Sequence, residues 1–164
     1  ATDKIIYDIV DNISQLIYEL KMKLSTKGEY ASRAMLELSA RFGQGPVPIR
    51  IIAQTQALPQ QFLEQILLSL RRAGYVKSKK GPKGGYYLSR PPDKITVAEV
   101  IRVMDGPLAP INCVSVIEHE PCPLEETCGL RSVWKEVRDM VAKHLEQTTF
   151  AEVLERQRAI NQKK

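Results

Sequence analysis

Residues 59–88 read Pro59-Gln-Gln-Phe-Leu-Glu-Gln-Ile-Leu-Leu-Ser-Leu-Arg-Arg-Ala-Gly-Tyr-Val-Lys-Ser-Lys-Lys-Gly-Pro-Lys-Gly-Gly-Tyr-Tyr-Leu88, and this stretch decides the fold. Its first half predicts a helix, because the apolar residues recur at spacings of three and four and share one face: Phe62, Ile66, Leu67 and Leu70. Pro59 suits the first turn of such a helix, and Gly74 suits the position just past its end. The second half predicts two short strands joined by a Gly- and Pro-containing turn.

Positive charge is concentrated around this hairpin. Residues 71–94 hold eight Lys or Arg and one acidic residue, whereas the whole 164-residue chain has 24 Lys and Arg against 19 Asp and Glu, a net charge of +5. A helix with a polar outer face followed by a cationic hairpin tip is typical of a winged helix–turn–helix domain. The helix of such a domain enters the major groove of DNA, and the wing reaches phosphates or the minor groove. We therefore predict a mainly α fold with a two-stranded wing that binds double-stranded DNA.

The chain before this stretch supplies the rest of the DNA-binding domain, which we expect to span residues 22–93. The apolar spacing predicts a helix from about Thr26 to about Arg41, and Thr26 and Glu29 have the spacing of a capping box. A short helix is expected after Pro48, which gives the element order of a winged helix–turn–helix domain. Residues 1–21 carry their own apolar stripe and are interpreted as an N-terminal amphipathic helical extension.

The chain after the wing predicts a sensor segment and a dimerisation segment. Residues 94–129 hold a short helix capped by Thr96 and then a loop of about twenty residues, a length that is uncommon unless functional. Residues 130–164 begin with a long amphipathic helix, followed by a final helix from Phe150 to about Gln157 and a polar tail. The apolar face of the long helix needs a partner surface, and antiparallel pairing with its copy in a homodimer supplies one. The expected interface residues are Leu130, Val133, Trp134, Val137, Met140, Val141 and Leu145.

Composition and motifs exclude several classes of protein. No apolar run approaches the roughly 18 residues that span a bilayer, so no membrane association is expected. The N-terminus lacks the basic-then-apolar order of a signal peptide. The sequence has no nucleophile–base pair, P-loop or Gly-rich dinucleotide turn, so we expect neither an enzyme nor a small-molecule substrate. We expect a cytoplasmic protein with reduced thiols.

Three cysteines lie in the long loop or at its end, with the spacing Cys113-x8-Cys122-x5-Cys128. Soft thiolates select zinc, copper(I) or iron–sulfur clusters. Structural zinc sites usually use four ligands that include closely spaced cysteine pairs, and this set lacks such a pair. An iron–sulfur cluster held by three thiolates and a fourth ligand from elsewhere fits the spacing better. Zinc binding, thiol redox chemistry and purely structural cysteines are the alternatives.

Four stretches together resemble a family of bacterial regulators that includes IscR, NsrR, RirA and CymR. The resemblance covers about residues 22–157 and implies a homodimeric winged-helix transcription factor that binds an operator with two-fold symmetry. In the cluster-binding branch it also implies that a 2Fe–2S or 4Fe–4S cluster on the three cysteines tunes DNA binding in response to iron, oxidants or nitric oxide. The stretches are Lys23-Leu-Ser-Thr-Lys-Gly-Glu-Tyr-Ala31, Phe62-Leu-Glu-Gln-Ile66, Gly81-Pro-Lys-Gly-Gly-Tyr-Tyr-Leu88, and the cysteine triplet before Trp134.

The resemblance leaves the fourth cluster ligand open. IscR-like members place a histidine three residues after the last cysteine, whereas this chain has Arg131 there, which cannot ligate a metal. NsrR-like members use an acid near the start of the first helix of the other subunit, and the matching residue here is Glu29. His119, inside the loop, is another candidate. The gap between the first two cysteines is wider than in IscR, which leaves the cluster type open as well.

Polar residues of the longer helix and basic residues of the hairpin are the candidate DNA contacts. Glu64 matches a family position that helps to set sequence preference, and a carboxylate in the major groove can accept a hydrogen bond from a cytosine amino group. Lys80 matches a wing arginine of IscR-like members, and lysine keeps the charge without the planar fork of arginine. The alternative for each helix residue is a solvated side chain without a DNA contact. The full set is Gln60, Gln61, Glu64, Gln65, Arg72, Lys77, Lys79, Lys80 and Lys83.

The sequence thus predicts a homodimeric DNA-binding regulator with an iron–sulfur sensor. One rival is a cluster-free regulator of the same fold that is controlled by thiol oxidation or by a partner protein, as the CymR branch suggests. A second rival is an interaction protein that has lost DNA binding.

Overall fold

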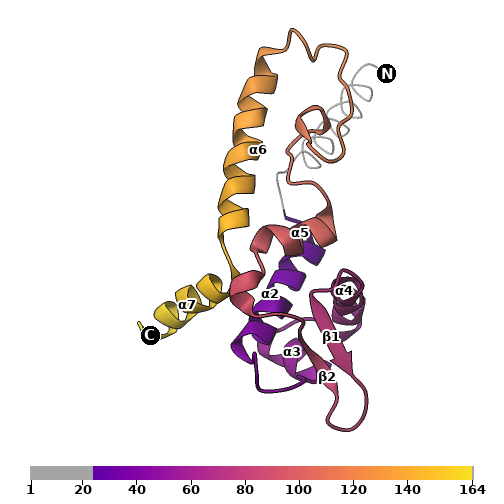
Figure 1. Cartoon of the computed structure of the whole chain (residues 1–164), viewed down its shortest axis with the longest axis vertical. Coiled ribbons are helices and arrows are strands. Elements are labelled where there is room, and N and C mark those ends of the chain that lie inside the picture. The colour runs from indigo at the N-terminus through magenta and orange to yellow at the C-terminus, as the bar shows by residue number, and fades with distance from the viewer. Residues whose placement is uncertain (1–23, 164) are drawn as a thin grey trace, which may run out of the picture.

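Helix α2 (Thr26–Ala40) lies at the centre of a helical body, and a long helix, α6 (Gly129–Gln147), extends away from that body (Figure 1). The computed structural model describes residues 24–163, so the expected N-terminal helix over residues 1–21 lies outside the described residues. The other elements, in chain order, are α3 (Ile49–Gln56), α4 (Gln60–Arg72), β1 (Val76–Lys79), β2 (Gly85–Leu88), the 3₁₀ turn η1 (Pro92–Lys94), α5 (Val97–Asp105), the 3₁₀ turn η2 (Asn112–Val114) and α7 (Phe150–Asn161). The expected mainly α fold with a two-stranded wing is confirmed.

The start of α2 differs from the expected capping box. Ser25, rather than Thr26, is the N-cap residue, and its hydroxyl accepts a hydrogen bond from the Gly28 N–H at 3.0 Å. Thr26 is therefore the first helical residue, and Glu29 lies one position too late to close a capping box. The Asp105 carboxylate, at the end of α5, accepts hydrogen bonds from the backbone N–H and the hydroxyl of Ser25. This second partner favours the earlier cap and ties the two helices together.

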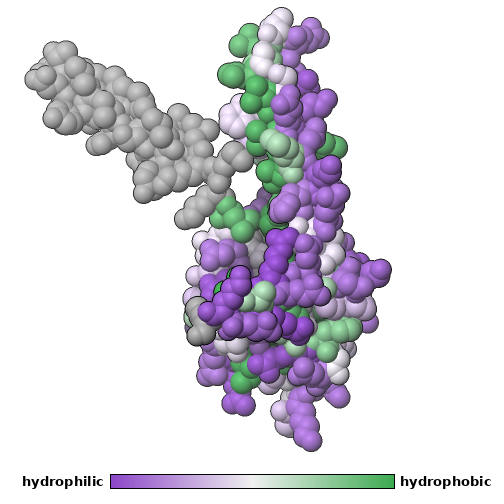
Figure 2. Space-filling view, turned by 90° about the vertical axis from the view of Figure 1, so that its left-hand side faces the viewer, coloured by the Kyte–Doolittle hydropathy of each residue, from purple (hydrophilic) through white to green (hydrophobic). Residues whose placement is uncertain are grey.

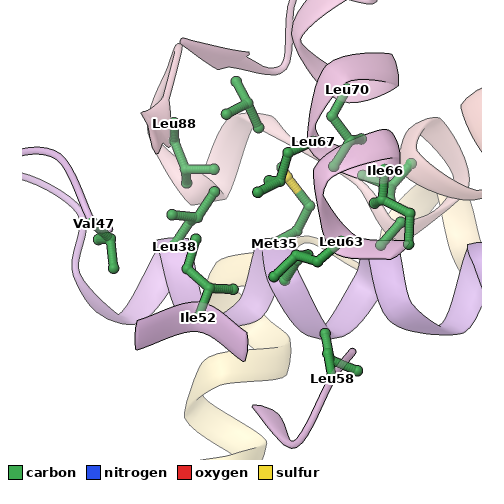
Figure 3. Packing of buried hydrophobic residues seen from close by; sticks show 14 of the residues in the cluster. Met35, Leu38, Val47, Ile52, Leu58, Leu63, Ile66, Leu67, Leu70 and Leu88 are labelled. Carbon is green, nitrogen blue, oxygen red and sulfur yellow. The ribbon is translucent and has the colours of Figure 1, made fainter. Parts of the chain in front are cut away.

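The hydrophobic core lies between α2 and α4 and is closed by the short helix α3 and the wing (Figure 3). Met35 and Leu38 of α2 face the buried residues of α4, and Leu88 of the wing packs onto the same cluster. Burial of each leucine contributes roughly 1.5–3 kcal/mol to stability. The buried face of α4 comprises Leu63, Ile66, Leu67 and Leu70. Phe62, expected on this face, is only partly buried and contacts Tyr30 edge-on, with 5.6 Å between ring centroids.

A left-handed residue shapes the turn between α3 and α4. Ala57 has φ 50° and ψ 51°, and the Leu58 N–H donates to the Ala53 carbonyl at 2.8 Å. A guanidinium nitrogen of Arg33 donates to the Gln56 carbonyl, which fastens the turn to α2. Arg33 is therefore committed to the helix–turn–helix unit itself.

The wing is an antiparallel hairpin whose register pairs Val76 with Leu88 and Lys79 with Gly85. Val47, before α3, forms a bridge to β2: the Val47 N–H donates to the Tyr86 carbonyl, and the Tyr86 N–H donates to the Val47 carbonyl, each at 2.8 Å. Gly85 makes this approach possible, because a Cβ at that position would lie 2.3 Å from the Val47 carbonyl oxygen. The paired glycines of the wing motif thus serve a close approach of two backbones.

The base of α6 is joined to the helical body by backbone hydrogen bonds. The Val97 N–H donates to the Thr148 carbonyl at 2.9 Å, and the Phe150 N–H donates to the Ile95 carbonyl at 3.0 Å. The Phe150 side chain, at the start of α7, is buried in the main core. Thr96 and Glu99 form the expected cap of α5 as a complete capping box. Helix α7 continues to Asn161, so the prediction that it ends near Gln157 was too short.

Candidate nucleic-acid interface and sensor loop

The polar face of α4 is open to solvent. Its candidate base-reading residues all lie on the surface, opposite the leucines that face the core. These side chains carry amide and carboxylate groups, which suit hydrogen bonding to base edges in the major groove. The exposed residues are Gln60, Gln61, Glu64 and Gln65, with Arg72 at the end of the helix.

The wing projects from the same end of the molecule as α4 and carries exposed positive charge. Lys77 and Lys79 alternate along β1, so they share one face of the strand, and Lys80 and Lys83 lie in the turn beyond it. All four lysines are exposed, and none forms an ion pair within residues 24–163. Figure 2 shows the hydrophilic tip that projects from the lower end of the molecule, where Figure 1 places the wing. Such lysines suit contacts to phosphates.

Arg71 connects the two parts of this surface. One of its guanidinium nitrogens donates to the Ser78 hydroxyl at 3.0 Å, which links the end of α4 to β1. Sequence analysis did not identify this contact, which helps to hold the wing against α4. No periodic pattern in the sequence pointed to this pair.

The three cysteines lie in the loop between α5 and α6 and at its end. Cys113 lies in η2 and is half-buried, Cys122 is exposed, and Cys128 immediately precedes α6 and is half-buried. All three are free thiols. Across the described part of the chain, no three Cys, His, Asp or Glu side chains gather closely enough to hold a metal ion. The three thiols therefore share one loop, but in this conformation they do not surround a common metal position.

A carboxylate that sequence analysis missed organises this loop. Glu125 accepts from a guanidinium nitrogen of Arg131 at 2.5 Å, and its carboxylate oxygens lie 3.0 and 3.1 Å from His119 Nε2. The hydrogen bond from His119 and the charge of Arg131 lower the pKa of the Glu125 carboxyl. His119, a candidate ligand, therefore has a partner in this conformation. Glu29, the other candidate, lies on α2 with a carboxylate oxygen 3.7 Å from Arg33.

A small cationic cavity adjoins Cys113. It encloses about 180 Å³ and is lined by His119 and by basic residues of α6. Arg138, one of these, also donates to the Val114 carbonyl, which holds the loop against the helix. The positive charge of this wall would offset negative charge developing on thiolates or on a group bound to them. The basic lining residues are Arg131, Lys135 and Arg138.

The expected interface residues of α6 leave an apolar face without cover. No residue of this helix is buried, and Leu130, Val133 and Met140 are 66%, 50% and 63% exposed. The rest of the stripe is half-buried: Trp134, Val137, Val141 and Leu145. Hydrophobic side chains are visible along the upper part of the molecule in Figure 2. Of the helices in residues 24–163, none is both long and apolar enough to cross a membrane.

Comparisons with known proteins agree with this architecture. A family model described as Rrf2, iron-dependent transcriptional regulator, matches residues 24–156. The transcriptional regulator CymR of Bacillus subtilis is 42% identical over 132 residues, which cover 80% of this chain and 89% of the relative. The regulator IscR of Photorhabdus laumondii is 32% identical over 140 residues, which cover 85% and 84% of the two chains.

Solved structures give the same result. The structure of CymR (YrzC), described as the global cysteine regulator of B. subtilis, has a TM-score of 0.69 and 39% identity, covering 82% of this chain and 98% of its own. The structure of T. potens IscR has a TM-score of 0.66 and 36% identity, covering 84% and 89%. The family match over residues 24–156 includes α4, the wing, the cysteine loop and α6.

Proposed function

The chain belongs to the Rrf2 family of transcriptional regulators, and from this membership we propose a homodimer that reads a two-fold-related operator and carries an iron–sulfur sensor on its cysteine loop. That it is a DNA-binding regulator and not an enzyme follows from the family. The main support for the dimer and the sensor is that the candidate DNA contacts and the cysteine loop lie at different ends of the molecule. The proposed DNA-reading surface of α4 and the wing lies at one end, the cysteine loop lies towards the other, and α6 runs from that loop to the helical body (Figure 1).

The DNA half of the proposal assigns different tasks to α4 and the wing. The exposed polar face of α4 would enter the major groove, where Glu64 would discriminate between bases rather than add affinity. The lysines of the wing would contact phosphates or the adjacent minor groove, which positions the helix without specifying sequence. Arg71 would keep the two parts in register through Ser78.

The dimer half of the proposal rests on the exposed stripe of α6. Leu130, Val133 and Met140 together expose a continuous apolar surface on one helix. Covering that surface with its copy would remove it from water and place two recognition helices about a two-fold axis. Two-fold symmetry in the protein then predicts two half-sites in the operator.

The chemistry of the loop suits an iron–sulfur cluster. Three soft thiolates are available within one loop, and the basic wall beside Cys113 would offset the negative charge of a thiolate-bound cluster. When bound, the cluster would supply an oxidant- and iron-sensitive group. Because the sulfurs are not gathered in the described conformation, Cys122 in particular would have to turn inward. Glu29 of the other subunit and His119 are the proposed fourth ligands.

Ligation would restrain the loop at three points. Cys128 immediately precedes α6, so a fixed Cys128 would hold the first turn of the long helix relative to Cys113. If Glu29 of the partner also ligates, the partner's α2 would join the same restraint. We propose that this restraint sets the spacing or orientation of the two recognition helices and hence operator affinity.

A second candidate is a cluster-free regulator that responds through its thiols or through a partner protein. The exposure of Cys122 favours it, because an accessible thiol can be oxidised without rearrangement of the loop. The resemblance to CymR, described as a global cysteine regulator, also supports it. Both candidates keep the same DNA-reading surface.

The deciding experiment is anaerobic purification of the wild type and of Cys122→Ser, with visible spectra and iron and sulfide counts. The cluster proposal expects about two or four irons per chain in the wild type and their loss in the variant. Leu124→Ser, which changes an exposed residue of the same loop, should keep its iron. Colourless wild-type protein, even after reconstitution with iron and sulfide, would instead support control by thiols or a partner.

A further inference from the structure

A cavity of about 510 Å³ lies where the loop after α5 folds against the C-terminal half of α6. Its volume is within the range of small-molecule sites, roughly 300–1,000 Å³. Its walls combine apolar side chains of the loop with charged side chains of the two helices, in which Asp139 and Glu146 pair with Arg138 and Arg102. The residues that matter here are Leu108, Val116, Ile117, Arg102, Arg138 and Lys143.

The apolar part of the wall is held open to solvent. Val116 and Ile117 are 79% and 68% exposed, although both are large hydrophobic residues. Their neighbours are fixed: Val114 is buried and its carbonyl accepts from Arg138, and the buried Ser115 accepts from the Glu118 N–H at 3.0 Å. The loop therefore presents this apolar pair at the cavity in a defined position.

The polar part of the wall offers a ligand one cation that is unpaired in the described part of the chain, the ammonium group of Lys143. Arg102 pairs with Glu146 through its terminal nitrogen, but its Nε is buried and has no partner within residues 24–163. Lys143 forms no ion pair among the described residues, whereas Arg138 is paired with Asp139. An apolar wall beside an unpaired ammonium group suits a ligand with an apolar body and one anionic head.

Most of the cavity lies on a different side of α6 from the proposed dimer surface. Its α6 residues Arg138, Ala142 and Glu146 follow one another at intervals of four and so share one face of the helix. At 3.6 residues per turn, this face lies roughly 150° around the helix from the centre of the exposed apolar stripe. Lys143 and Gln147 line the cavity on the side nearer to Met140. A partner helix that covers Val133 and Met140 would therefore leave the side of Arg138 and Ala142 accessible.

We propose that this cavity is a binding site for a small amphipathic carboxylate. The carboxylate pairs with Lys143, and the apolar body covers Val116 and Ile117. Such a ligand contacts the loop after α5, the end of α5 and α6 at once. This inference does not depend on the nature of the sensor, because it uses none of the cysteines.

The test is calorimetric titration of the full chain, purified anaerobically, with octanoate as the probe and octanamide as its neutral analogue. We expect saturable binding of one octanoate per chain, with octanamide weaker by about tenfold because it lacks the charge. Lys143→Gln should weaken octanoate by about tenfold but leave octanamide nearly unchanged. Ile117→Asp should weaken both ligands.

Two control variants make the outcome decisive. Leu124→Asp introduces the same charge at another exposed apolar position of the loop, and Lys163→Gln removes a lysine far along the chain. Both should bind octanoate within about twofold of the wild type. Circular dichroism checks that every variant is folded. Absence of saturable binding by the wild type would overturn the proposal, as would equal losses in Leu124→Asp and Ile117→Asp.

Discussion

Single residues of this protein show where backbone geometry dictates sequence. Gly85 has φ 155°, and a Cβ there would meet the Val47 carbonyl oxygen, so the residue owes its identity to the neighbouring backbone. Ala57 is the one non-glycine residue with positive φ among the described residues, and it lies in the turn before α4. The two positions give opposite expectations for substitution.

Gly85→Ala should lower both stability and operator affinity. The added methyl group would force β2 away from Val47, break the two hydrogen bonds of the bridge and displace the wing. Loss of this bridge should cost about 1–3 kcal/mol of unfolding free energy, measured by urea titration, with a parallel fall in operator affinity. Gly129→Ala is the matched control, because its Cβ would meet no atom within 4 Å and should leave both quantities nearly unchanged.

Ala57→Gly should stabilise the fold. The left-handed conformation costs an L-residue roughly 1–2 kcal/mol, and glycine avoids that cost. The greater freedom of glycine in the unfolded chain offsets roughly 0.5–1 kcal/mol of the gain. A net increase of about 0.5–1 kcal/mol is expected in chemical denaturation. A lower free energy of unfolding in this variant would show that the turn is not strained at Ala57.

At the scale of elements, sequence periodicity located α4, the wing, α5 and α6 because each buries or exposes one face. It failed where a distant residue decides the outcome. The cap of α2 moved to Ser25 because Asp105, eighty positions away, completes it. Glu125 escaped notice because its partners His119 and Arg131 meet it only in the folded loop. Leu63 was not among the expected core residues of α4 because the buried face of this helix is broader than the apolar pattern indicated.

Two variants distinguish the proposed base reading by α4 from the proposed phosphate contacts of the wing. Lys79→Ala should weaken binding to all DNA sequences alike and reduce the slope of log affinity against log salt by about 1. Glu64→Ala should instead relax the preference at one base pair by about 1–3 kcal/mol and leave the salt slope unchanged. Fluorescence anisotropy with the operator and with single-base variants distinguishes the two results. Equal effects on sequence preference from both substitutions would contradict this assignment.

At the scale of the whole molecule, the exposed stripe of α6 determines the expected assembly. Val133→Glu should weaken the proposed dimer by at least about tenfold, because a two-fold interface would bury two copies of the new charge. Sedimentation equilibrium over a concentration series measures the change. Lys135→Glu, which adds the same side chain on the exposed opposite side of α6, should leave the dimer unaffected. A Val133→Glu protein that assembles like the wild type would place the interface elsewhere.

The buried Phe150 and the backbone hydrogen bonds around Thr148 fix the C-terminal end of α6 to the helical body, whereas its N-terminal end, after Cys128, lies away from that body (Figure 1). A helix of 19 residues is roughly 28 Å long, so a shift of about 3 Å at Cys128 would tilt it by roughly 6°. Because these hydrogen bonds fix the C-terminal end of α6, such a tilt would also move α5 and the core residues that pack against it. In the proposed regulator, the stiffness of this one joint would set how much of a change at the cysteine loop reaches the operator-binding surface.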